Sequence, residues 1–133
     1  MTTSSEVKYR LTLTEAQARI VKDALDLYFR IGIGQFREVE HVYNYTLLRG
    51  TKDMERLREA LDAAARTQGF GFGGSYGIHS TEVHDVFRQA YDINRVIRHR
   101  MAWDRLPSGG PGVDFDTPRQ IGTFPLPSIE TLK

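Results

Sequence analysis

The stretch TEAQARIVKDALDLYFRIGIG, residues 14–34, indicates that the fold is built on helices. Thr14 and Gln17 have the spacing of a capping box, in which each side chain bonds the backbone N–H of the other residue at a helix start. Apolar residues then recur at helical spacing, at Ala16, Ile20, Ala24, Leu27 and Ile31. Gly32 and Gly34 are expected to break or bend this helix.

The same periodicity predicts about four helices in all. A second apolar pattern comprises Phe36, Val39, Val42, Tyr43 and Leu47. A third helix, capped by Thr51 or Asp53, places its apolar residues inward at Met54, Leu57, Leu61 and Ala64. The last and longest helix spans about 82–104 and is capped by Ser80 or Thr81. Its predicted core stripe is Val86, Ala90, Ile93, Ile97 and Met101.

Residues 6–13 alternate with period two, which predicts a half-buried strand. One side carries Val7, Tyr9, Leu11 and Leu13, and the other carries Lys8, Arg10 and Thr12. From Pro107 the chain reads as extended, with short edge strands expected at 113–116 and 121–124. The predicted fold class is therefore mainly α with a small β contribution (α+β), in a single domain over 1–133 with a flexible N-terminus at 1–5 and an extended tail at 107–133.

Composition narrows the function classes. The length of 133 residues suits one domain, and the formal net charge of +1 counts against a general nucleic-acid coat or a membrane-surface protein. No apolar run approaches the roughly 20 residues of a membrane span, and no signal peptide is recognisable. The absence of cysteine excludes disulfides and thiolate zinc sites. We expect a cytoplasmic protein.

Three partial catalytic motifs fail on their context. Residues 69–74 fit Gly-x-Gly-x-x-Gly, but that motif binds a dinucleotide only between a strand and a helix, and here a helix precedes it. Glu38-x-x-His41 has the spacing of a di-iron bundle without the required second copy, so a surface pair is the better interpretation. Residues 79–84, HSTEVH, carry one residue too many for an inverted zinc-protease motif. We predict a protein that is not an enzyme, with no cofactor and no catalytic metal.

The last helix and the glycine-rich loop before it carry the candidate ligand-binding residues. A helical wheel opposes the core stripe with a polar face at Arg88, Tyr91, Asp92, Arg95 and His99, with Arg98 on its flank. Arginine and tyrosine side chains suit phosphate binding and base stacking, and the loop adds the aromatic rings of Phe70, Phe72 and Tyr76. The alternatives are a solvated charged face and loop aromatics packed into the core. Arg100 lies nearer the core side, so it needs a buried partner or a subunit interface.

Two segments, LTLTEAQARIVKDALDLYFRIGIGQFREV at 11–39 and AYDINRVIRHRMAWDR at 90–105, resemble a widespread set of short bacteriophage proteins. That set is similar to the phage anti-CBASS sponge family, whose members form tetramers that sequester cyclic dinucleotide immune signals. The resemblance implies a ligand class, a cyclic nucleotide, and a homo-oligomer. A homo-oligomer is also favoured by a strand without a hairpin partner and by more large apolar residues than one small helical core needs. These residues are Tyr28, Phe29, Ile31, Ile33, Trp103, Phe115 and Phe124.

Together with the basic helix and the aromatic loop, this resemblance implies a phage immune-evasion sponge that binds a cyclic di- or trinucleotide defence signal in the host cytoplasm without cleaving it. One alternative is an inhibitor that acts by protein contact with a host enzyme. The other is a small nucleic-acid-binding regulator, although the near-neutral charge makes nucleic acid the less suitable partner.

Overall fold

The computed structural model describes residues 6–43, 51–69, 76–109 and 117–132, and within them the chain is mainly helical. The elements are α1 (Glu15–Gly32), the short 3-10 helix η1 (Phe36–Glu38), α2 (Val39–Tyr43), α3 (Thr51–Thr67) and α4 (Asp85–Arg105). No helix in these ranges is long and apolar enough to cross a membrane.

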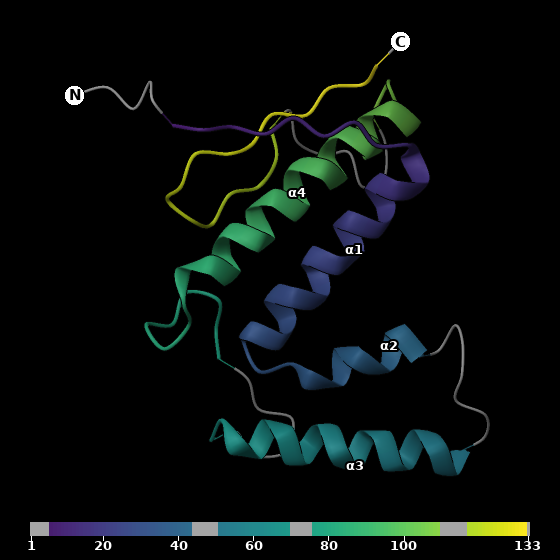
Figure 1. The fold of residues 1–133 in the computed structure, drawn as a ribbon, viewed down its shortest axis with the longest axis vertical. Helices are drawn as coiled ribbons and strands as arrows, with labels where there is room; N and C mark the ends of the chain where they lie inside the picture. Colours follow the sequence, from purple (N-terminus) through teal and green to yellow (C-terminus); the bar gives the residue numbers. More distant parts are fainter. Residues whose placement is uncertain (1–5, 44–50, 70–75, 110–116, 133) are drawn as a thin grey trace.

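The two long helices α1 and α4 form the centre of the molecule. They lie side by side and run in opposite directions (Figure 1). Their core holds Phe29, Ile33, Val83, Ala90 and Tyr91. The rings of Phe29 and Tyr91 meet edge to face, with centroids 5.1 Å apart, a geometry that aromatic pairs prefer.

The apolar face predicted for α4 is confirmed in part, but the apolar face predicted for α1 was wrong. Ala90 and Ile97 of α4 are buried. On α1, however, Ile20 is exposed and Phe29 is the buried residue. The true apolar face of α1 is therefore rotated from the predicted one, because α4 packs against the Phe29 side.

The helix starts were predicted with mixed success. The capping box is present, with the Gln17 N–H donating to Thr14 Oγ1 at 3.1 Å and the Thr14 N–H donating to Gln17 Oε1 at 2.9 Å. For α4 the predicted cap was wrong. The residue that caps it is His84, whose Nδ1 accepts the Val86 N–H at 3.0 Å. The chain turns through 77–83 first, so Ser80 and Thr81 lie before the helix.

A second part of the molecule is joined to the first through η1 and held by ion pairs. It consists of α2 and α3, which lie below the α1–α4 pair in Figure 1. Arg37 donates to both carboxylate oxygens of Asp62 at 2.8 Å. Arg58 of α3 donates to the buried Glu40 carboxylate of α2, with its shortest contact at 2.6 Å.

These ion pairs set the titration of both carboxyl groups. Hydrogen bonding from Arg58 is the main cause that lowers the pKa of Glu40, and hydrogen bonding from Arg37 does the same for Asp62. Both carboxyl groups are therefore held in the charged form that the arginines bind.

The structure does not show the predicted β contribution. Residues 6–13 are extended but form no strand, and no strand occurs elsewhere in the described ranges. A strand needs a neighbour to pair with, and none of the described segments supplies one. The predicted edge strand at 113–116 lies outside the described residues, and 121–124 forms bends. The C-terminal segment, residues 117–132, makes a loop beside α4 and then runs on towards the C-terminus (Figure 1).

Candidate functional site

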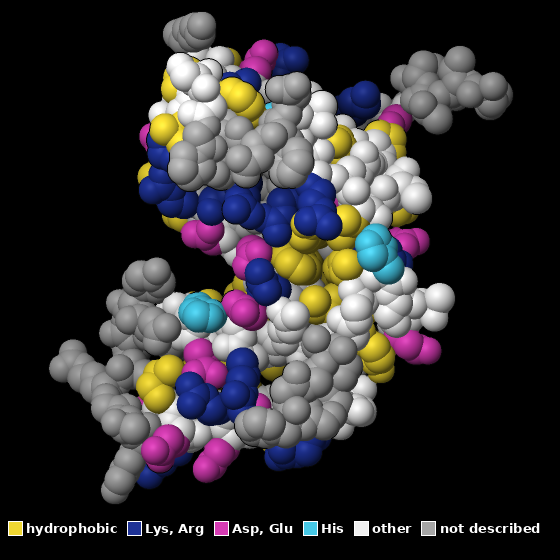
Figure 2. Space-filling model, turned by 180° about the vertical axis from the view of Figure 1, so that it is seen from behind, with side chains coloured by type: hydrophobic (Ala, Val, Ile, Leu, Met, Phe, Trp, Pro, Cys, Tyr) yellow, Lys and Arg dark blue, Asp and Glu magenta, His cyan; other side chains and the backbone are white. Residues whose placement is uncertain are grey.

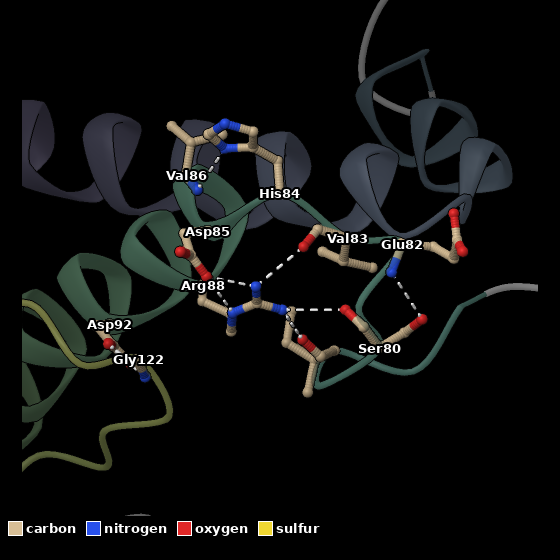
Figure 3. Close-up of polar contacts among 10 residues, drawn as sticks. Ser80, Glu82, Val83, His84, Asp85, Val86, Arg88, Asp92 and Gly122 are labelled. Atoms are coloured by element: carbon tan, nitrogen blue, oxygen red, sulfur yellow. Dashed lines mark hydrogen bonds and ion pairs between the residues drawn. The ribbon is translucent and has the colours of Figure 1, made fainter.

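Arg88, the first predicted phosphate-binding residue, is fully used in holding the fold together. Its guanidinium donates to the carbonyl oxygens of Ile78 at 2.8 Å, Ser80 at 3.4 Å and Val83 at 2.9 Å. It also pairs with Asp85, one turn earlier (Figure 3). The side chain is only 15% exposed. These contacts tie the 78–83 turn to α4 and engage all three guanidinium nitrogens. Arg88 is therefore not available to bind a phosphate.

Tyr91 and Asp92 lie inside the molecule rather than on a solvent-facing surface. Tyr91 is 9% exposed and Asp92 is 3% exposed. The Asp92 carboxylate accepts the backbone N–H of Ile121 at 2.7 Å and of Gly122 at 2.9 Å. The helical wheel failed here because α1 packs against Tyr91 through Phe29 and the C-terminal segment binds Asp92. A wheel holds no information on which segment covers which face.

Arg95 and Arg98 are the predicted cations that stay available. Arg95 is partly exposed, and its guanidinium lies over the Tyr91 ring, 4.5 Å from the centroid. Arg98 is exposed. Residues three apart on a helix are surface neighbours. No carboxylate among the described residues forms an ion pair with Arg95 or Arg98.

Six other arginines form ion pairs with aspartate or glutamate side chains. They are Arg19, Arg30, Arg37, Arg58, Arg88 and Arg100. Arg100 was expected in a buried pair or at a subunit interface, but its ion pair with Asp104 at 2.9 Å is not buried, since both side chains are 40% exposed. Arg56, Arg66 and Arg105 also lie on helices without a described ion pair, so Arg95 and Arg98 are distinguished by lying one turn apart on the same helix.

His99 follows Arg95 by one turn but serves a different contact. Its Nε2 accepts the indole N–H of Trp103 at 3.1 Å, and the two rings lie 6.3 Å apart. His99 borders the Arg95–Arg98 surface, and its Nε2 is engaged with Trp103 in this arrangement.

The predicted aromatic loop is described only at its end. Phe70 and Phe72 lie outside the described residues. Tyr76 is partly buried and packs against the core cluster. Its backbone N–H donates to the Ile33 carbonyl at 2.8 Å, and its hydroxyl contacts the Gln68 carbonyl at 3.3 Å. Tyr76 therefore follows the alternative interpretation, in which the loop aromatic is a core residue.

Lysine and arginine side chains lie close together on the face shown in Figure 2, with acidic side chains below them. They form a band beside an apolar patch, above the hollow that separates the α1–α4 pair from the α2–α3 part. Such a band attracts anions even though the net charge is only +1.

The partial metal motifs form no metal-binding group within the described ranges. No three histidine or acidic side chains of those ranges are placed to hold one ion. Glu38 and His41 form the predicted surface pair, with 3.6 Å between Oε2 and Nε2.

Comparison of the chain with protein-family models, curated proteins and solved structures gives no significant match.

Proposed function

We propose that the protein binds and sequesters a cyclic di- or trinucleotide without cleaving it, with Arg95 and Arg98 of α4 as the phosphate-binding groups. One observation carries this proposal: these two arginines lie one turn apart on α4 and neither pairs with a carboxylate among the described residues. Arg56, Arg66 and Arg105 also have no described ion pair, but none of them has another such arginine within one turn of its helix. An arginine left without a carboxylate keeps its planar set of donors available for a phosphate.

The contact between Arg95 and Tyr91 supports a specific geometry for binding. The buried Tyr91 ring holds one face of the guanidinium, which fixes the plane of the donors before any ligand arrives. A preorganised group loses less conformational entropy on binding. Arg95 then contacts phosphate through its edge, and a base stacks on its outer face. This assigns to Arg95 the stacking role that the loop aromatics were expected to have.

Support for sequestration instead of cleavage comes from the sequence, which lacks a complete catalytic motif. The resemblance of residues 11–39 and 90–105 to short phage proteins supplies the ligand class and the setting, the cytoplasm of an infected host. The protein would lower the concentration of a defence signal by binding it stoichiometrically.

A thermal-shift screen against a panel of cyclic di- and trinucleotides tests the proposal. A ligand that binds only the folded state raises the unfolding temperature by mass action. We expect at least one member of the panel to do so, and the shift to be smaller for Arg95→Ala and Arg98→Ala. Arg56→Ala is the matched control because it removes an exposed arginine of α3 that has no described ion pair.

Two results of this screen would favour the alternative functions. If no cyclic nucleotide shifts the transition well above micromolar concentration, inhibition through protein contact becomes the better hypothesis. Tight binding of duplex DNA with a steep dependence on salt would instead indicate a nucleic-acid-binding regulator.

A further inference from the structure

The N-terminal segment, residues 6–13, has the properties of a strand that lacks its sheet. It is extended, and none of its backbone N–H or C=O groups forms a hydrogen bond with another described residue. Val7, Tyr9 and Leu11 share one side and are 73%, 94% and 74% exposed. An extended edge with an exposed apolar row is a template for pairing with another chain.

We propose that residues 6–10 pair with the same residues of a second copy, as an antiparallel two-stranded ribbon whose two-fold axis passes at Lys8. A two-fold contact uses the same surface of both copies, so one segment supplies both halves of the interface. This proposal concerns an interface and does not depend on the nucleotide site.

The side-chain pattern selects an antiparallel arrangement with a residue on the axis. Paired residues in a sheet point to the same face. An axis between two residues would place each apolar side chain opposite a polar one, because the apolar residues occupy alternate positions. A parallel, in-register pair would place Lys8 beside Lys8 and Arg10 beside Arg10.

Charge then selects among the axis residues that keep two residues on either side within residues 6–13, namely Lys8, Tyr9, Arg10 and Leu11. With the axis at Leu11, Arg10 lies opposite Thr12 of the partner subunit twice and no charged side chains face each other. With the axis at Tyr9, Lys8 lies opposite Arg10 of the partner subunit twice. With the axis at Arg10, two arginines meet and no opposite charges pair. With the axis at Lys8, Glu6 lies opposite Arg10 of the partner subunit twice, and Val7 lies opposite Tyr9 of the partner subunit twice.

The Lys8 axis carries one unfavourable contact and several favourable ones. The two lysines meet at the axis, where both side chains are exposed and long enough to diverge into solvent. Against this stand two opposite-charge pairs and two pairs of an aromatic with a β-branched side chain, both of which stabilise sheets. The Tyr9 and Arg10 registers have like charges opposed without any compensating ion pair, and the Leu11 register has no ion pair at all.

Cysteine cross-linking tests the register cleanly because the chain contains no cysteine. In the proposed ribbon, position 8 of one copy lies directly opposite position 8 of the other, within reach of a disulfide. Lys8→Cys should therefore form a covalent dimer under mild oxidation. Arg10→Cys is the control, because the two copies of position 10 lie at opposite ends of the ribbon and should give only background cross-linking.

A mixing experiment adds a second readout. Glu6→Cys and Arg10→Cys should each stay monomeric on denaturing gels when oxidised alone, and should form a dimer when mixed. Glu6→Arg should weaken association of the cysteine-free protein in sedimentation, and Glu6→Arg with Arg10→Glu should restore it. Cross-linking of Lys8→Cys should persist in Arg95→Ala.

Two outcomes would overturn the proposal. One is cross-linking of Arg10→Cys as efficient as that of Lys8→Cys, which would mean random collision or another register. The other is a wild-type mass of 15.2 kDa at every concentration together with background cross-linking of Lys8→Cys.

Discussion

The structural role of Arg88 leads to a quantitative prediction about stability. Replacing Arg88 by alanine removes the donors that serve the Ile78 and Val83 carbonyls at 2.8 and 2.9 Å. Hydrogen bonds from a charged donor contribute about 1.5–3 kcal/mol each when they are shielded from water. The Asp85 pair adds less than about 1 kcal/mol, since Asp85 is 62% exposed. We therefore expect Arg88→Ala to lower the free energy of unfolding by about 3–7 kcal/mol.

Arg88→Lys keeps the charge but loses the planar arrangement of donors, so it should recover only about half of that loss. Urea denaturation followed by the circular dichroism of the helices measures both variants. Arg98→Ala is the control on the same helix, and we expect it to stay within about 0.5 kcal/mol of the wild type because its side chain is exposed. An Arg88→Ala protein as stable as Arg98→Ala would refute the structural role.

Three further predictions concern other contacts. Gly32→Ala should destabilise the protein by about 1–3 kcal/mol in the same assay, since the new methyl group would lie 2.2 Å from the Phe87 ring; unchanged stability would contradict this packing. Asp92→Ala should release the C-terminal segment, seen as faster tryptic cleavage within it, and an unchanged cleavage rate would show that the carboxylate does not hold it. Hydrogen bonding from Arg37 lowers the pKa of Asp62 below its ordinary value of 3.8. The ion pair therefore stabilises the folded state fully at pH values above 3.8, and this stabilisation is lost as the pH falls through the lowered pKa. Urea denaturation at about pH 7 and about pH 3 measures how much unfolding free energy is lost on acidification, and this loss should be smaller for Asp62→Asn than for the wild type. Equal losses in the two proteins would contradict a stabilising Arg37–Asp62 pair.

Local signals in the sequence predicted the helical segments, although not the cap of α4 or the buried face of α1. Thr14 and Gln17 mark the start of α1 because a capping box depends only on residues three apart. Gly34 has a φ of 93° beyond the end of α1, a conformation that favours glycine. These features need no knowledge of distant segments.

The placement of the site residues depended on contacts that sequence spacing does not contain. Asp92 was expected on a solvated face, but it binds backbone groups 29 and 30 residues later in the chain. Arg37 and Asp62 were not predicted to pair, since 25 residues separate them. Arg95 was chosen correctly as a partly exposed cation, whereas its packing on Tyr91 was not foreseen.

Isothermal titration of wild type, Arg95→Ala and Arg56→Ala with the cyclic nucleotide that gives the largest thermal shift tests the central claim most directly. Loss of one charge-assisted contact of about 1.5–3 kcal/mol corresponds to roughly ten- to hundredfold weaker binding. We expect that loss for Arg95→Ala, which should stay folded because the contact with Tyr91 contributes only about 1 kcal/mol. Arg56→Ala should bind like the wild type. Equal affinity of wild type and Arg95→Ala, or no heat of binding from any cyclic nucleotide to the wild type, would contradict a phosphate site on this face of α4.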